Sequence, residues 1–318
     1  MTRANAVALA RCAGLALLLA TACGDDAPSA TDAGGFADAT PGDASVDGAP
    51  DDARTDAATD AGEDAPRPPP FVGPTGSTEG CGRAAEAGTT VRSIDVRGTE
   101  RSFRLAVPEG YDPDAPHALV FVWHGLGGSA SNFQRLMRME TTAGGAAIAV
   151  YPQGLPRVGD ADGWDLDDDG EDVALFDAVY AEIASELCID RARVFSTGFS
   201  HGGFMSNLLG CVRGDVVRAI APIAGASAGR RCTGQVAAWL VHGTADLVVV
   251  PNLGKAARGR WLVRNGCSRE ATPTTPEGCS EYLGCDEGYP VVWCEHSGPH
   301  TVPAWVPAAA WGFFDGLD

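Results

Sequence analysis

The stretch Arg193-Val-Phe-Ser-Thr-Gly-Phe-Ser-His-Gly-Gly-Phe-Met-Ser-Asn-Leu-Leu209 determines how the rest of this chain can be interpreted. It predicts a buried strand over residues 194–197, a Gly-x-Ser-x-Gly turn, and an apolar-periodic helix from Gly203. This layout is typical of a nucleophile elbow, which holds a serine on a strained turn at the top of a sheet. Gly198 and Gly202 fit such a turn because neighbouring backbone leaves no room for a Cβ atom.

The pentapeptide by itself is weak evidence, because a chain with 41 glycines produces such matches by chance. A second match, Gly225-Ala-Ser227-Ala-Gly229, follows another apolar run. Arg230-Arg-Cys-Thr-Gly comes next and gives no helical pattern, so Ser227 is expected in a turn. Ser200 is therefore the predicted nucleophile.

A serine hydroxyl needs a general base, and the base needs a third group to orient it. Asp246 lies just beyond a predicted buried strand, and His300 lies in a glycine-containing loop after a later strand. The order Ser, Asp, His is that of α/β-hydrolases. Among the other histidines, His296 is expected on a strand end and His242 in the core, so neither is the preferred base.

An oxyanion produced by attack of the serine needs backbone donors. The sequence His124-Gly125-Leu126 ends an early apolar strand (118–123), where a second oxyanion amide is expected. We assign the oxyanion hole to the backbone N–H groups of His201 and Leu126.

The remaining pattern predicts strands alternating with helices. A hairpin (90–96 and 101–107) precedes the strand at 118–123, and a helix (132–142), a strand (146–151) and a helix (172–187) follow. After the elbow come strands at 218–223 and 238–242, a helix at 254–264, a hairpin at 279–294 and a helix at 308–314. This alternation predicts an α/β fold with a mainly parallel, doubly wound sheet and helices on both faces.

The acidic run Asp165-Leu-Asp-Asp-Asp-Gly170 matches the start of an EF-hand calcium loop. The twelfth position of that pattern requires a bidentate acid but is occupied by Phe176. Acidic residues also favour a helix N-terminus without metal. Helix capping is the preferred interpretation, calcium binding stays open as the alternative, and no metal is assigned.

Residues 1–22 have a cationic start and a short apolar run, which predict a signal peptide rather than a membrane span. Ala20-Thr-Ala22-Cys23 fits either ordinary cleavage or a lipoprotein signal that lipidates Cys23, although Ala20 stands where such signals usually have leucine. We expect export, with a lipid anchor at Cys23 at the cell envelope or surface preferred over free secretion.

Residues 23–80 are expected to form a disordered acidic linker, rich in Asp, Ala, Gly and Pro. Within them, residues 24–70 carry 12 acidic and 2 basic residues, which is −10 of the chain's net charge of −19. Such a segment cannot bury enough apolar surface to fold. The chain has no Lys/Arg run or basic patch, so nucleic-acid binding is not expected.

Six motifs occur in an order that resembles the secreted polyhydroxybutyrate depolymerase-like esterases, which include feruloyl and acetyl-xylan esterases. They are Tyr151-Pro-Gln-Gly154, Gly163-Trp-Asp165, Asp172-Val-Ala-Leu-Phe176, Gly198-Phe-Ser-His-Gly-Gly203, His242-Gly-Thr-Ala-Asp246 and Gly298-Pro-His300. The resemblance covers residues 81–318. It implies the α/β-hydrolase fold, no cofactor, and Ser200, Asp246 and His300 as the triad. Family members often carry tryptophan two residues after the histidine, whereas this chain has Val302.

The chain has ten cysteines, and eight of them follow the linker, an even set suited to disulfides. The hairpin at 279–294 places Cys279 opposite Cys294, so we expect a Cys279–Cys294 bridge and a Cys267–Cys285 bridge. The pairing of Cys81, Cys188, Cys211 and Cys232 stays open, and their spacings match no usual zinc signature.

These features predict an exported, monomeric serine carboxylesterase acting on feruloyl or acetyl esters of plant polysaccharide, or on polyhydroxybutyrate-type esters. Trp164 and Trp305 are candidate substrate-binding residues, with core packing as the alternative. A non-catalytic surface binding protein and a peptidase on the same fold stay open as other functions.

Overall fold

The computed structural model of the chain describes residues 75–317. The predicted signal peptide (1–22), Cys23 and most of the predicted linker lie outside the described residues.

The folded domain begins earlier than the predicted boundary at Cys81. Ser77 forms a β-bridge with Asp190, and Thr78 is buried. The Thr78 hydroxyl donates to the Leu187 carbonyl (2.6 Å) and accepts from the Ile189 N–H (3.0 Å). The end of the segment expected to be linker therefore belongs to the domain, because it satisfies backbone groups at the end of a helix.

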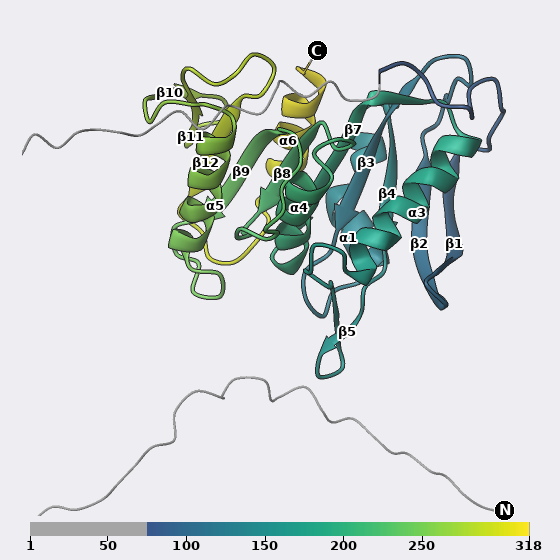
Figure 1. The fold of residues 1–318 in the computed structure, drawn as a ribbon, viewed down its shortest axis with the longest axis horizontal. Coiled ribbons are helices and arrows are strands. Elements are labelled where there is room, and N and C mark those ends of the chain that lie inside the picture. The colour runs from purple at the N-terminus through teal and green to yellow at the C-terminus, as the bar shows by residue number, and fades with distance from the viewer. Residues whose placement is uncertain (1–74, 318) are drawn as a thin grey trace, which may run out of the picture. The chain divides into compact units, whose positions relative to one another are not determined.

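A ten-stranded sheet forms the centre of the domain, in the order β1-β2-β4-β3-β7-β8-β9-β12-β11-β10 (Figure 1). The strands are β1 (Gly88–Val96), β2 (Thr99–Val107), β3 (His117–Trp123), β4 (Ala147–Pro152), β7 (Ile189–Phe199), β8 (Ala219–Ile223), β9 (Ala237–Gly243), β10 (Ala271–Thr274), β11 (Cys279–Tyr282) and β12 (Val291–His296). Six neighbouring strands of the sheet pair in parallel: β4, β3, β7, β8, β9 and β12. Two antiparallel strands flank them on each side, β1 and β2 at one edge and β11 and β10 at the other. The carboxyl ends of the six parallel strands thus meet at one edge, where ligands bind in open α/β sheets.

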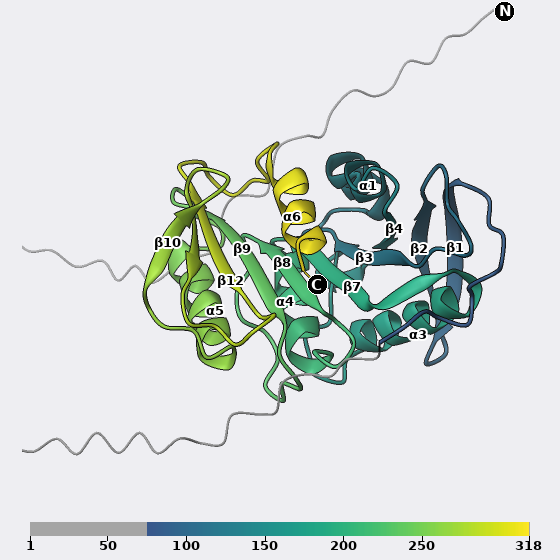
Figure 2. The ribbon, with the colours of Figure 1, turned by 90° about the horizontal axis from the view of Figure 1, so that it is seen from above.

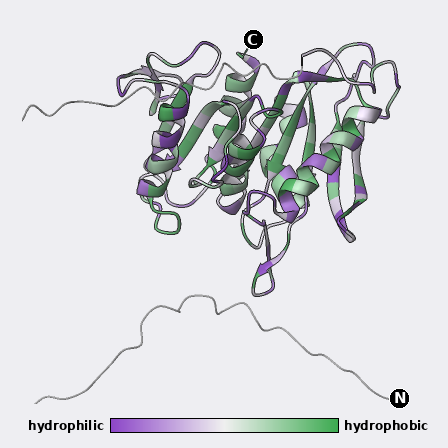
Figure 3. Ribbon diagram, in the orientation of Figure 1, coloured by the Kyte–Doolittle hydropathy of each residue, from purple (hydrophilic) through white to green (hydrophobic). Residues whose placement is uncertain are grey.

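Helices cover both faces of this sheet, as Figure 2 shows. One face carries α3 (Glu171–Glu186), α4 (His201–Val212) and α5 (Pro251–Arg264), and the other carries α1 (Ala130–Met137), α2 (Met139–Thr142) and α6 (Val306–Asp315). The residues of strands β3, β8 and β9 are almost all apolar, and these strands are buried along their whole length because helices cover both of their faces (Figure 3). This is the two-faced arrangement expected for the α/β-hydrolase fold.

Three elements differ from the prediction. The expected single helix at 132–142 is divided into α1 and α2, because Arg138 between them is left-handed (φ 43°) and the Met139 N–H donates to the Tyr151 hydroxyl. A small hairpin, β5 (Leu155–Val158) with β6 (Ala161–Gly163), and the edge strand β10 were not predicted. The strands β5 and β10 are short and largely exposed, so they carry no apolar periodicity that would predict them.

Four disulfides cross-link the domain. Cys279 pairs with Cys294 and Cys267 with Cys285, the two bridges expected from the sequence, and Cys81–Cys188 and Cys211–Cys232 complete the set. Such a set belongs to an oxidising compartment outside the cytosol, so the domain is exported. No helix within residues 75–317 is long and apolar enough to cross a membrane.

Candidate active site

The elbow lies between β7 and α4, at the centre of the sheet's carboxyl edge. Ser200 has φ 55° and ψ −119°, a conformation that costs a non-glycine residue of order 1–3 kcal/mol. Its N–H donates to the Ile223 carbonyl at the end of β8 (2.9 Å). Gly202 is required here, because a Cβ atom on it would overlap the Trp123 carbonyl at the end of β3. The turn is therefore held by close backbone contact with two neighbouring strands.

Asp246 and His300 meet although 54 residues separate them. His300 Nδ1 lies 2.7 Å from Asp246 Oδ2. The other carboxylate oxygen accepts the N–H groups of Val248 and Val249, both at 2.9 Å. Burial would raise the pKa of Asp246, but the hydrogen bonds from His300 and the two amides outweigh it and lower the pKa. Asp246 is therefore a buried, ionised acceptor for the imidazole.

The His300 ring packs against Phe199, the residue before Ser200, with ring centroids 4.6 Å apart. Because Asp246 occupies Nδ1, Nε2 is the nitrogen left to exchange a proton with a neighbouring group. The two alternative histidines are engaged in other contacts, although His242 also lies next to Asp246. His296 Nδ1 accepts the Gly298 N–H (3.1 Å), while His242 is buried, with Nε2 2.7 Å from the Val249 carbonyl and 3.5 Å from Asp246 Oδ2.

The two amides predicted for the oxyanion hole are on neighbouring segments, the His201 amide at the start of α4 and the Leu126 amide in the loop after β3. Within residues 75–317, neither N–H donates to a protein acceptor. Leu126 Cδ1 and the His201 imidazole both lie within 3.0 Å of the position that a Cβ atom on Gly163 would take. These two segments are therefore adjacent, with unpaired donors available.

The ring of His124 holds the loop that carries Leu126. Its Nδ1 lies 2.8 Å from the Gly125 carbonyl, and its Nε2 accepts the Gly154 N–H (3.0 Å). Burial lowers the pKa of His124 despite the opposing bond to Gly125. The ring is thus neutral, with the proton on Nδ1, and both nitrogens have a structural partner. From the sequence, His124 was assigned only to the end of a strand, and its role in holding the loop was not predicted. The feature that could have indicated this role is its position directly after an all-apolar strand.

Trp164 does not form a substrate rim, because only 2% of it is exposed. Its indole N–H donates to the His124 carbonyl (2.7 Å), and its backbone N–H donates to His201 Nδ1 (3.1 Å). It therefore joins the two segments that carry the free amides. The prediction of a rim residue was wrong because the Gly163-Trp-Asp165 motif turns the indole into the core.

Trp305 does not line the cavity that includes His300. It packs edge-on against Trp239 (6.0 Å between centroids) and lines a separate hollow with residues of β12 and α6. The cavity that includes His300 has instead a volume of about 380 Å³. Its walls are mostly apolar and come from the 124–129 loop, from α1 and from the segment after His300, and they include Leu126, Phe133, Leu136, Phe199 and Val302.

The acidic run at 165–170 is engaged in protein contacts. The Asp165 carboxylate accepts the N–H groups of Asp167 (3.1 Å) and Glu171 (3.0 Å), so it caps the start of α3. The Asp168 carboxylate accepts the N–H groups of Arg230 and Arg231 (both 2.9 Å). These contacts agree with the capping interpretation.

A buried ion pair supports the same region. Arg101 lies 2.5 Å from Asp172, and both side chains are almost fully buried. The second oxygen of Asp172 accepts the Asp165 N–H (2.6 Å), immediately after Trp164. This pair is not predictable from the sequence, because nothing in the local pattern shows that the arginine of a hairpin is buried.

Comparison with known proteins identifies relatives that share most of the domain. A family profile described as "Esterase FrsA-like" matches residues 86–230. Feruloyl esterase D of Neurospora crassa is 33% identical over 277 residues, which cover 77% of this chain and 92% of that protein. Feruloyl esterase C of Emericella nidulans is 33% identical over 258 residues, covering 75% and 91%.

Solved structures share the fold at low sequence identity. The acetyl xylan esterase from Aspergillus awamori has a TM-score of 0.56 at 15% identity and covers 71% of this chain and 99% of that one. A ferulic acid esterase from Anaeromyces mucronatus has a TM-score of 0.51 at 19% identity and covers 73% and 90%. Because relatives at 33% identity match over most of both chains, this chain belongs to the feruloyl esterase family and is an esterase with the α/β-hydrolase fold.

Proposed function

We propose that the protein is a serine carboxylesterase in which Ser200 is the nucleophile, His300 the general base and acid, and Asp246 the group that orients His300. The observation that carries this proposal is the 2.7 Å contact between His300 Nδ1 and Asp246, on a ring packed against the elbow that holds Ser200. Such a pair leaves Nε2 to take the serine proton.

The reaction has two halves. His300 Nε2 accepts the Ser200 hydroxyl proton as Oγ attacks the carbonyl carbon, and the Leu126 and His201 N–H groups donate to the oxyanion. The imidazolium, stabilised by Asp246, then gives its proton to the departing alcohol, which leaves an acyl-enzyme. His300 next takes a proton from water, the hydroxide adds to the acyl carbon, and Ser200 leaves with that proton.

The proposed substrate is a feruloyl or acetyl ester carried by a plant polysaccharide. The names of the relatives support this class, and so does the apolar cavity beside His300, which offers Phe133, Phe199 and Leu136 to a planar aromatic acyl group. Initial rates on methyl ferulate, acetylated xylan and hydroxybutyrate oligomers at equal concentration would rank the acyl groups. Preference for the hydroxybutyrate oligomers would overturn the feruloyl assignment.

Ser200→Ala should reduce kcat on p-nitrophenyl acetate by on the order of 10⁵-fold, because no other group can form the acyl-enzyme. Ser227→Ala is the matched control, since Ser227 lies in the second Gly-x-Ser-x-Gly sequence and should retain hydrolysis of this ester. Equal rates for Ser200→Ala and the wild type would exclude the proposed nucleophile.

Trp164→Phe should lower kcat roughly 10- to 100-fold with little change in KM, because loss of the indole N–H frees the His124 carbonyl and shifts the Leu126 amide. Trp123→Phe is the control: it also removes a buried indole hydrogen bond, to the Ser196 hydroxyl (3.1 Å), but not one to the oxyanion loop. Steady-state kinetics and melting temperatures of both variants test this. A kcat of Trp164→Phe equal to that of the wild type would show that Trp164 acts only on stability.

Acidification should destabilise the domain below about pH 6.5. Burial lowers the pKa of His201 from its ordinary value of 6.5, so in this range the unfolded chain binds more protons than the folded one. The contribution of neutral His201 to the free energy of unfolding is therefore fully present above pH 6.5, and it is lost as the pH decreases below that value. Melting temperatures between pH 7.5 and 5 would show this fall, and His201→Gln should make it less steep. An identical slope in the variant would contradict the assignment to His201.

We further propose that Cys23 is lipidated. All eight cysteines within residues 75–317 are paired in disulfides, so after loss of residues 1–22 Cys23 is the one cysteine without a partner. Mass spectrometry of the protein from detergent-extracted envelopes should find an acylated N-terminal Cys23, and Cys23→Ser should be released into the medium. A mature N-terminus without lipid would indicate free secretion instead.

A further inference from the structure

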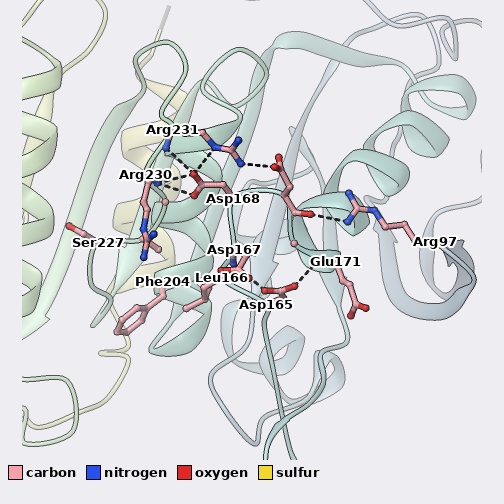
Figure 4. A pocket seen from close by; sticks show the side chains of 14 residues that line it. Arg97, Asp165, Leu166, Asp167, Asp168, Glu171, Phe204, Ser227, Arg230 and Arg231 are labelled. Carbon is pink, nitrogen blue, oxygen red and sulfur yellow. Dashed lines mark hydrogen bonds and ion pairs between the residues drawn. The ribbon is translucent and has the colours of Figure 1, made fainter.

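A second hollow, distinct from the cavity beside His300, lies over α4 and the start of α3 (Figure 4). This groove has a volume of about 860 Å³, within the range of ligand sites. Three segments and one hairpin residue form it: the acidic loop 165–171, Phe204 of α4, the loop 227–231 after β8, and Arg97.

Each of the three segments is linked to the backbone of Ser200, the proposed nucleophile, or to the residue after it. The Phe204 N–H donates to the Ser200 carbonyl (3.0 Å). The acidic loop follows Trp164, whose N–H donates to the ring of His201 (3.1 Å). The loop 227–231 follows β8, whose last carbonyl accepts the Ser200 N–H (2.9 Å). The groove therefore begins about one helical turn from the nucleophile.

Most of the charges in the groove are paired. The Arg231 side chain contacts Asp168 (3.3 Å) and Asp169 (2.5 Å), Glu171 pairs with Arg157 (2.8 Å), and Arg97 donates to the Asp169 carbonyl. Burial opposes ionisation of Asp168, but the Arg231 and Arg230 N–H groups lower its pKa, so it stays charged and keeps the two loops together.

Two charged side chains of opposite sign are left. Among residues 75–317, no acceptor binds the Arg230 guanidinium and no donor binds the Asp167 carboxylate. Figure 4 shows the Arg230 guanidinium directed toward Phe204, the residue whose N–H donates to the Ser200 carbonyl. Donors, acceptors and an apolar ring are thus exposed together.

This combination fits a neutral polyhydroxylated ligand. Sugar hydroxyls both donate and accept, so they can use a donor-only guanidinium and an acceptor-only carboxylate at once, while the C–H face of a sugar ring packs on an aromatic side chain. A strongly anionic or cationic ligand would meet like charge, because the lining carries both signs. We infer that the groove binds the sugar units of the ester's alcohol portion, while the apolar cavity takes the acyl portion.

This inference rests on the proposed function and adds a second subsite to it. An ester has an acyl portion and an alcohol portion. The cavity beside His300 is mostly apolar and suits the acyl portion, whereas the groove is lined by charged side chains and suits a polyhydroxylated alcohol portion. The cavity includes Phe199, which precedes Ser200, and the groove includes Phe204, which follows it by four residues.

The test compares two feruloyl esters that share the acyl group but differ in the alcohol: methyl ferulate and a feruloylated arabinoxylo-oligosaccharide. Arg230→Ala should lower the ratio of kcat/KM on the oligosaccharide to kcat/KM on methyl ferulate about tenfold, chiefly through KM. The matched control is Arg269→Ala, which removes an exposed arginine next to β10, outside the groove. It should leave the ratio as in the wild type. An unchanged ratio in Arg230→Ala would overturn the inference.

Binding without turnover gives a second measurement. Calorimetry with an ester-free arabinoxylo-oligosaccharide should detect binding to Ser200→Ala, and the double variant Ser200→Ala/Arg230→Ala should bind about tenfold more weakly. Equal affinities would also exclude the groove as a saccharide site. Failure of the proposed function looks different, because the wild type would then hydrolyse neither feruloyl ester.

Discussion

The close approach of the first turn of α4 to the end of β3 is the constraint on which the site depends. Gly202 lies against the Trp123 carbonyl, and no residue with a Cβ atom fits there. This contact forces the turn between β7 and α4 to be tight, so Ser200 adopts φ 55°. It also brings the start of α4 beside the loop that continues from β3. The strained serine and the two free amides therefore result from one packing contact rather than from separate features.

A chain of buried polar contacts extends this constraint outward. Arg101 and Asp172 form an ion pair in the core, Asp172 binds the backbone after Trp164, and Trp164 binds both His124 and His201. Two guanidinium nitrogens of Arg101 have no partner within residues 75–317, and the cost of burying them offsets the attraction within the pair. Its value lies in fixing the position of Asp165, and through it the tryptophan that spans the two amide-bearing segments.

Sequence reasoning predicted the parts of this site that follow strand ends. Residues Ser200, Asp246 and His300 each come after a strong apolar strand, and parallel strands bring such positions to one edge. The role of Trp164 could not be predicted, because the partners of an indole N–H depend on which way a loop folds back onto the core.

The start of the domain was placed too late for a similar reason, since the position of Thr78 depends on its contacts with the end of α3. Arg138 divided a predicted helix because a contact with Tyr151, distant in sequence, outweighed local periodicity.

The Cys211–Cys232 bridge connects α4 to the loop that forms one wall of the groove inferred to bind sugar units. Arg260 of α5 reinforces this connection by donating to the Ala228 and Gly229 carbonyls, each at 2.8 Å. A surface loop without such cross-links would have to lose conformational entropy each time a ligand bound, and that loss would subtract from affinity. Here the entropy is lost once, when the disulfide forms during folding. A wall fixed in this way can recognise a weakly binding, flexible polymer chain through few contacts, because only the polymer has to become ordered.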